Sequence, residues 1–150
     1  MKNNDSEEEK SKRANQDDPI VMYLIVRESL NMSIGKTAAQ CAHASQMLQI
    51  EYDRIKKLVF LGSGISYASE KEKQEYYIFH QWLDSSFRKV VLKADEREWK
   101  KIKEELSYPM VSVIDAGLTE VEPNTNTVIG VFPMYKSACP KIIKKLQLLK

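Results

Sequence analysis

Residues 20–26 form an uninterrupted apolar run, IVMYLIV, and this run limits the folds open to the chain more than any other feature. A strand with one face in water alternates apolar and polar residues, whereas a strand covered on both faces is apolar throughout. Arg27 ends the run, and a polar turn follows it. The run therefore predicts a strand in a sheet that is covered on both faces.

Helical and strand-like patterns alternate along the rest of the chain. Helices are predicted where apolar residues recur at helical spacing, and Ser33 and Asp95 are predicted to cap two of them. Strands are predicted where short apolar runs follow turns. The predicted helices cover residues 34–58, 70–83, 95–106 and 140–149, and the predicted strands cover residues 20–26, 87–94, 110–114 and 127–132. This order predicts the α/β class, as a single domain with a four-stranded mixed β-sheet and helices on both faces.

The first 18 residues differ in composition from the rest. They are almost devoid of large apolar side chains, so burial cannot offset the entropy of ordering them, and a disordered charged leader is expected there. Residues 19–150 are expected to form the α/β domain. Because the leader holds six acidic and four basic residues, the domain carries a net charge of about +4, which is compatible with a polyanionic partner but does not require one.

The sequence also bears on location and cofactors. The apolar run at residues 20–26 is too short to cross a bilayer and follows a charged segment, so we expect no secretion signal, no membrane helix and a cytoplasmic location. The two histidines and two cysteines show no paired ligand spacing. No metal and no cofactor are therefore expected.

A polar stripe lies on the helix predicted from residue 34. Lys36, Gln40 and His43 are spaced by four and three residues, so their side chains share one face. Gly35 precedes Lys36 at the start of the helix, where free backbone N–H groups attract anions. A solvated helix face explains this spacing as well as a binding site does.

A second motif, DAGLTEVEPNTNTVIGVFP, follows the strand predicted at residues 110–114. Together with LIVRESL, SIGKTAAQCAHA and RKVVLKA, in that order along the chain, it resembles the archaeal and eukaryotic type of peptidyl-tRNA hydrolase. The resemblance covers nearly everything after Pro19. It implies an enzyme that hydrolyses the ester bond between a peptide and tRNA, with peptidyl-tRNA as its partner, and it leaves open whether two copies associate as a homodimer.

Hydrolysis of this ester needs an activated water and a place for the negative charge that develops on the carbonyl oxygen. Asp115 is the candidate to activate water, and Lys36 is the candidate to hold the oxyanion or a tRNA phosphate. Both follow predicted strands, so they are expected to meet at the carboxyl edge of the sheet. Thr119 is expected to share a hydrogen bond in the loop of Asp115. The candidate catalytic residues are Lys36, Asp115, Thr119, His43 and Gln40, and the candidate substrate-binding residues are Gly35, Arg27, Gly117 and Thr125.

Ordinary structural roles also account for single members of this set. Asp115 precedes Ala116 and Gly117, where Asp is a common turn residue, and a lone helical histidine such as His43 is more often packed or solvated than catalytic.

Four positions depart from the pattern of the family. Ser29 stands where Asp is usual, Ile34 where Lys is frequent, Leu118 where Arg is frequent and Asn124 where Gly is frequent. Two of these changes replace cations with apolar side chains beside the candidate site. These changes leave open an alternative, a noncatalytic RNA-binding or protein-docking module with the same fold. A further alternative shares the ester chemistry: an esterase that acts on a different acylated tRNA such as D-aminoacyl-tRNA.

Overall fold

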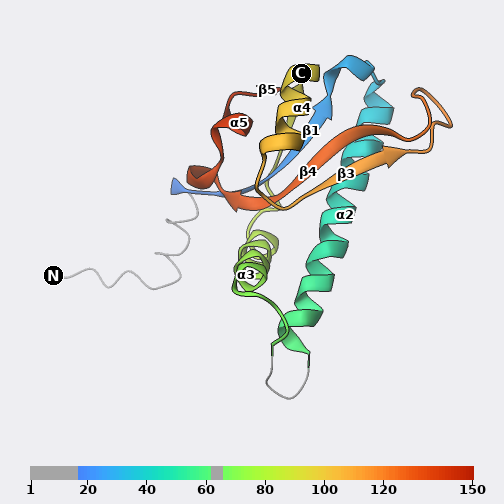
Figure 1. Ribbon diagram of the computed structural model, residues 1–150. Helices are drawn as coiled ribbons and strands as arrows, with labels where there is room; N and C mark the ends of the chain where they lie inside the picture. The colour runs from blue at the N-terminus through green and yellow to red at the C-terminus, as the bar shows by residue number, and fades with distance from the viewer. Residues whose placement is uncertain (1–16, 62–65) are drawn as a thin grey trace.

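The computed structural model describes residues 17–61 and 66–150, which form one mixed sheet with helices on both of its faces (Figure 1). The strands are β1 (Ile20–Arg27), β2 (Lys89–Ala94), β3 (Met110–Asp115), β4 (Thr125–Tyr135) and β5 (Gln147–Leu148). The helices are α2 (Ile34–Phe60), α3 (Glu70–Asp84), α4 (Glu96–Glu105) and α5 (Lys141–Lys144), with short 3-10 turns η1 (Glu28–Leu30) and η2 (Lys136–Ala138). The predicted α/β class is confirmed.

The sheet has five strands in the order β3-β4-β1-β2-β5, so the prediction of four strands is wrong. β1 and β2 run parallel, and the other neighbouring pairs are antiparallel. The sheet is therefore mixed, as predicted.

The additional strand comes from the C-terminal segment, which was predicted to be helical throughout residues 140–149. Pro140 does open a helix, but α5 ends at Lys144, and β5 then pairs with β2 through Leu148 opposite Leu92. The N–H of Leu149 donates to the carbonyl oxygen of Val91 at 3.0 Å. The edge of β2 offers these backbone partners, and that pairing outweighs the local helical pattern.

The core consists of two layers, one on each face of the sheet. Residues 20–26 of β1 are buried, which confirms that this strand is covered on both faces. Leu24 belongs to the layer formed with α2 and α3, which includes Leu48 and Phe79. Ile25 belongs to the opposite layer, with Trp99 of α4. The continuous apolar run thus supplies both layers from one strand.

Helix α2 runs along one face of the sheet and continues beyond it to pack against α3 (Figure 1). Its first turn is capped by the hydroxyl of Ser33, which accepts a hydrogen bond from the N–H of Lys36 at 3.2 Å. Asp95 caps α4 through a reciprocal pair of hydrogen bonds with Glu98. Both predicted caps are confirmed, so local sequence signals place the start of the helix that carries Lys36.

The position of α2 over the sheet depends on Gly130 of β4. A β-carbon at this position would lie 3.0 Å from Cδ1 of Leu48, 3.2 Å from Cβ of Ala44 and 3.2 Å from Cγ2 of Val111. Gly130 and Ala44 therefore let the backbones of the helix and the strand approach closely.

We expect Gly130→Val to lower the free energy of unfolding by about 1–3 kcal/mol, because the added side chain overpacks this contact. The midpoint of urea unfolding measures the effect. Gly35→Ala is the matched control, since no atom lies within 4 Å of a β-carbon there, and it should not lower the midpoint. An unchanged midpoint for Gly130→Val would mean that the contact is not tight.

Only the last two residues of the predicted leader are described. Asp18 accepts hydrogen bonds from the N–H and the hydroxyl of Ser137, at 2.9 and 2.5 Å. Residues 1–16 lie outside the described residues. The glycines at 62 and 64, which the sequence predicts to end the helix that starts at residue 34, also lie outside them. Among the helices of the described residues, none has the length and apolar character needed to cross a membrane.

Candidate active site

Lys36 and Asp115 meet at one edge of the sheet, although 79 positions separate them in the sequence. The Nζ atom of Lys36, in the first turn of α2, lies 2.5 Å from Oδ1 of Asp115, the last residue of β3. The two side chains are 12% and 9% exposed. The pair is therefore largely shielded, which strengthens its charge interaction, and it still keeps an opening to solvent.

Two further donors hold the carboxylate of Asp115. Nε2 of Gln40 donates to Oδ1 at 3.1 Å, and the backbone N–H of Gly117 donates to Oδ2 at 2.8 Å. The hydrogen bond from Lys36 is the largest of the causes that hold the pKa of Asp115 below its usual range, followed by the one from Gly117. Asp115 is thus ionised at neutral pH, as a group that accepts a proton from water must be.

Thr127 belongs to this network and was not among the sequence candidates. Its hydroxyl donates to Oε1 of Gln40, so the amide of Gln40 bridges Thr127 and Asp115. Val113 pairs with Val128 and Ile114 pairs with Asn126, which leaves Thr127 as the extra residue of a bulge in β4. Such a bulge re-aims a side chain, and here it lets Thr127 reach α2 on the same face as Val128.

Gly117 is required at its position by the backbone. Its φ is 74°, and a β-carbon would lie 2.4 Å from the nitrogen of Pro123. Asn124, where the family often has glycine, also has a positive φ, of 61°, and its N–H donates to the carbonyl oxygen of Asp115 at 2.8 Å. Asn tolerates this conformation better than most residues do. The departure at position 124 therefore preserves the shape of the loop.

Glu120 joins the loop between β3 and β4 to the start of α2, a contact that sequence reasoning missed. Its carboxylate accepts hydrogen bonds from the backbone N–H of Ser33 at 2.7 Å and from the hydroxyl of Ser33 at 2.5 Å. These bonds hold the pKa of Glu120 below its usual range. Ser33 thus caps α2 and anchors the loop that follows Asp115.

The free energy of unfolding is expected to fall with decreasing pH below about pH 4, the ordinary range of a carboxyl group. Glu120 has a lowered pKa in the folded chain, so its contribution is complete above the unfolded pKa and is lost as the pH falls through the folded value. Glu120→Gln should therefore give a smaller drop in the urea midpoint between pH 6 and pH 3 than the wild type gives. Glu122→Gln, an exposed change in the same loop, is the control. An undiminished drop in Glu120→Gln would contradict this role.

The structure does not bring every sequence candidate to Asp115. His43 lies in a groove on the β3 side of α2, with Met47 and Ile114. Thr119 is exposed, and among the described residues the side chain of Asp115 bonds to Lys36, Gln40 and Gly117 rather than to Thr119. The hydroxyl of Thr125 donates to the carbonyl oxygen of Glu122 at 2.6 Å. Gly35 is exposed beside Lys36.

Arg27, the fourth substrate-binding candidate, is already paired. Its guanidinium donates two hydrogen bonds to Glu96, at 2.7 and 2.8 Å, and lies 5.7 Å from the ring centre of Trp99. Ser29, another departure from the family pattern, donates to the same carboxylate. The hydrogen bonds from Arg27 and Ser29 lower the pKa of Glu96 to about 2. Arg27 thus fixes α4 against the end of β1.

The two apolar departures are the most exposed large hydrophobic residues beside the pair. Ile34 is 90% exposed at the start of α2, and Leu118 is 88% exposed in the loop that follows Asp115. Neither contributes to the core, so both are open to contact with a bound molecule.

Across residues 17–61 and 66–150 there is no group of three or more His, Cys, Asp or Glu side chains placed to hold a metal ion. The Lys36–Asp115 pair combines a cation and a carboxylate with the hydrogen-bond donors of Gln40 and Gly117. It can orient a water molecule, accept its proton and stabilise an anion.

Comparison with known proteins identifies the family. Residues 20–149 match the family described as peptidyl-tRNA hydrolase PTH2. This chain belongs to that family. A peptidyl-tRNA hydrolase of Thermococcus onnurineus is 32% identical over 130 residues, covering 84% of this chain and 94% of the relative. One of Sulfurisphaera tokodaii is 34% identical over 134 residues, covering 85% and 97%.

Membership in the peptidyl-tRNA hydrolase PTH2 family confirms the resemblance that the motifs indicated. The match extends from the first residue of β1 to the residue after β5, so it includes every element that positions the Lys36–Asp115 pair. The family is one of hydrolases that act on an ester bond. The groups at the Lys36–Asp115 pair can therefore be compared with what hydrolysis of an ester bond requires.

Proposed function

We propose that this chain hydrolyses peptidyl-tRNA in the cytoplasm, with the Lys36–Asp115 pair as its reaction centre. The contact that carries the proposal is the 2.5 Å approach of Nζ of Lys36 to Oδ1 of Asp115, in a site that also holds the amide of Gln40. Family membership supports the reaction, and the pair offers the two groups that ester hydrolysis needs.

In the proposed reaction, a water oxygen attacks the carbonyl carbon of the ester, and the carboxylate of Asp115 accepts the proton that the water loses. The carbonyl oxygen becomes negative and is stabilised by the ammonium group of Lys36 at the start of α2. The carbon–oxygen bond to the ribose then breaks. The departing ribose oxygen takes up the proton from Asp115, which restores the carboxylate.

Gln40 and Gly117 are positioning residues in this proposal. Gln40 is 3% exposed and is held by Thr127, so it fixes the carboxylate from the buried side. The N–H of Gly117 fixes the other carboxylate oxygen. Thr119, exposed in the same loop, and Gly35, exposed at the start of α2, are proposed to contact the substrate. We assign no step to His43, Arg27 or Thr125.

The test is hydrolysis of an N-blocked aminoacyl-tRNA by the full chain, followed as release of the blocked amino acid. Turnover that persists in the presence of a metal chelator is expected. Lack of turnover at any substrate concentration, with tRNA still bound, would instead support the noncatalytic RNA-binding alternative. The proposal requires one copy of the chain, and the homodimer considered from the sequence is not part of it.

A further inference from the structure

The edge of the sheet that carries Asp115 is open. β3 is the outermost strand on its side of the sheet, and among the described residues it pairs with β4 alone (Figure 1). A groove of about 390 Å³ lies between this strand and α2. The residues that line it include His43, Met47 and Ile50 on the helix and Ser112 and Ile114 on the strand.

The hydrogen bonds between β3 and β4 show which backbone groups face the open side. The N–H of Phe132 donates to the carbonyl oxygen of Pro109 at 3.0 Å, so these two residues form a hydrogen-bonded pair. Bonded pairs alternate with non-bonded pairs in an antiparallel ladder, which makes Val111 and Val113 the next residues bonded to β4. The N–H and carbonyl groups of Ser112 therefore point away from β4.

The same holds for Ile114 at the end of the strand. The carbonyl oxygen of Asp115 accepts from the N–H of Asn124 at 2.8 Å, so Asp115 is directed toward the β4 side. Ile114, between Val113 and Asp115, then presents its backbone groups to the open side. In the described part of the chain, no backbone hydrogen bond outside the ladder involves Ile114.

This edge lacks the features that usually prevent strand pairing. Exposed edges are commonly protected by charged side chains, by proline or by a bulge in the edge strand. Residues 110–114, MVSVI, contain no charge and no proline, and the bulge belongs to β4. The side chain of Ile114 is 63% exposed, and none of the described residues that line the groove is Asp, Glu, Lys or Arg. Unpaired backbone groups beside an uncharged groove can accept an extended peptide as an added strand.

The open edge leads directly to the proposed reaction centre. Asp115 follows Ile114 without a gap, at the end of β3. On the other wall of the groove, Gln40 bonds to Asp115 and precedes His43 by three residues, or about 4.5 Å along the helix axis. Both walls therefore start at the Lys36–Asp115 pair.

We propose that the open edge of β3 binds the peptide of the substrate as an added strand, parallel to β3, through the backbone of Ser112 and Ile114. The proposal rests on the function proposed above, because an ester held at the Lys36–Asp115 pair fixes the carboxyl end of the peptide beside the last residue of β3. The peptide then extends along the strand toward Met110. Recognition is assigned to the peptide backbone, which favours extended chains with free N–H groups over particular side chains.

A parallel strand makes these bonds with every second residue. One peptide residue donates its N–H to the carbonyl oxygen of Ser112 and accepts from the N–H of Ile114, and the residue two positions before it bonds to Met110 and Ser112. The side chains of the peptide alternate between the two faces of the sheet, with Met47 and Ile50 of α2 beside one face.

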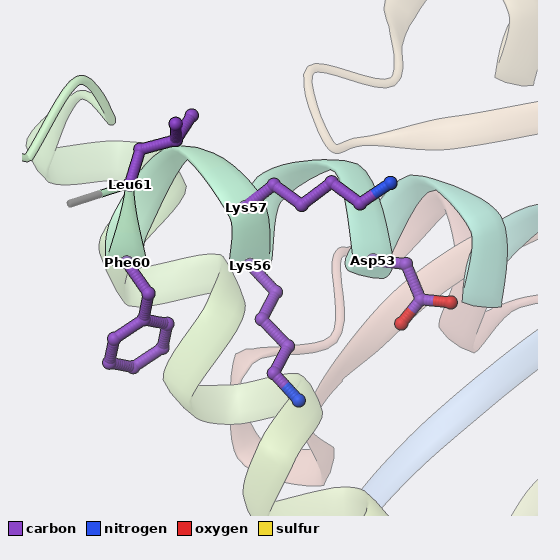
Figure 2. Close-up of a pocket in the computed structure, with 5 residues that line it drawn as sticks. All are labelled: Asp53, Lys56, Lys57, Phe60 and Leu61. Atoms are coloured by element: carbon purple, nitrogen blue, oxygen red, sulfur yellow. The ribbon is translucent and has the colours of Figure 1, made fainter.

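A second pocket, near the end of α2, offers apolar surface without a strand edge. Figure 2 shows that its labelled residues belong to α2 and to Leu61 directly after it. Asp53, Lys56 and Lys57 bring charges of both signs into this pocket. Lys56 follows Lys36 by 20 residues, or about 30 Å along the helix. The second pocket therefore provides a control position on the same helix.

The first test varies the length of the peptide. The substrates are tRNAs esterified to N-blocked peptides of one to six alanines. The edge from Ile114 to Met110 spans four residue steps, or about 13 Å. We expect kcat/KM to rise about tenfold to a hundredfold between one and four residues, which corresponds to two or three added hydrogen bonds, and then to level off.

The second test methylates the peptide nitrogens one at a time in the four-residue substrate. Methylation of a nitrogen that faces β3 removes a hydrogen bond, so it should lower kcat/KM about threefold to tenfold. Methylation of the neighbouring nitrogens should have little effect. The expected result is a loss with a period of two residues.

Ser112→Pro tests the edge from the side of the protein. It removes an N–H that faces the open side, and proline is tolerated on edge strands in that orientation. We expect kcat/KM to fall about threefold to tenfold on the four-residue substrate and to stay unchanged on the single-residue substrate, which does not reach Ser112. Ser112→Ala keeps the backbone N–H and is the matched control. The thermal midpoint shows whether each variant is folded, and if Ser112→Pro is not, the methylated substrates decide with the wild type alone.

Ile50 and Phe60 provide a matched pair of side chains. Both are 62% exposed, and one lines the groove while the other lines the second pocket. Ile50→Ala should lower kcat/KM on a six-residue leucine peptide about threefold to tenfold. Phe60→Ala should not change it, and a loss in Phe60→Ala alone would instead place the peptide in the second pocket.

Three results would overturn the proposal for β3 while turnover by the wild type still supports the proposed function. One is a kcat/KM that does not depend on peptide length. Another is a set of methylation effects without a period of two. The third is an equal loss in Ser112→Pro on the long and short substrates. A dimer that dissociates in Ser112→Pro, together with no dependence on length, would assign the edge to a second copy of the chain.

A peptide joined to adenosine by an amide in place of the ester separates the two proposals. Its binding needs the edge of β3 but no hydrolysis, so its affinity should also increase with length up to about four residues. Length-dependent binding without turnover of any ester would contradict the proposed function and retain the role of β3. Turnover with binding that is independent of length would do the reverse.

Discussion

Asp115→Asn is expected to lower kcat/KM on an N-blocked aminoacyl-tRNA by about a hundredfold to ten-thousandfold, the usual contribution of a general base. The amide has nearly the same shape as the carboxylate, and its one oxygen can still accept the hydrogen bond from Lys36, but its NH2 group cannot accept the one from Gly117 and it cannot take up the proton of the attacking water. Steady-state hydrolysis of the tRNA ester measures the effect, and the thermal midpoint shows whether the variant is folded.

Glu28→Gln is the matched control for this variant. Glu28 accepts from Nζ of Lys93 at 2.5 Å, so the substitution also weakens a lysine–carboxylate pair, but in η1 instead of at the end of β3. It should retain wild-type turnover. If Asp115→Asn also retained turnover while folded, Asp115 would not be the base.

Lys36→Met is expected to lower kcat by about a hundredfold or more, as for removal of one preorganised oxyanion donor. It should also change the pH profile. The hydrogen bond from Lys36 is the largest cause of the lowered pKa of Asp115, so its loss raises that pKa. Asp115 would then be protonated at higher pH, and the acidic limb of the kcat/KM profile should move to higher pH.

The same experiment distinguishes the two roles considered for Lys36. An ammonium group that only holds a tRNA phosphate would raise KM and leave kcat unchanged. Lys73→Met is the control, because it removes a lysine that lies 2.9 Å from the carboxylate of Glu70 on α3. A lower kcat for both variants would indicate a general loss of folded protein, and an unchanged pH profile in Lys36→Met would contradict the coupling to Asp115.

Most of the fold could be predicted because its signals are local. The apolar run at residues 20–26 identified a strand covered on both faces, and the caps at Ser33 and Asp95 placed the starts of two helices. Lys36 and Asp115 were expected to meet because both follow predicted strands, and Gln40 because it shares a helix face with Lys36. The structure brings these three residues together.

The parts that could not be predicted depend on contacts between distant segments. β5 consists of two residues, and its strand conformation comes from pairing with β2 rather than from its own sequence. Ser33 and Glu120 are 87 positions apart, so their hydrogen bonds leave no pattern in either segment. Arg27 was a candidate for substrate binding, and only the structure shows Glu96 opposite it.

Thr127 was overlooked for a different reason. Strict alternation along β4 would direct its side chain to the opposite face from Val128, and only the extra residue of the bulge turns it toward Gln40. The number of residues in β4 therefore matters more here than the identity of most of them. Evolution can exchange side chains along this strand and repack them, whereas an insertion or deletion between Asn126 and Val128 would rotate the hydroxyl away and release the amide that it holds.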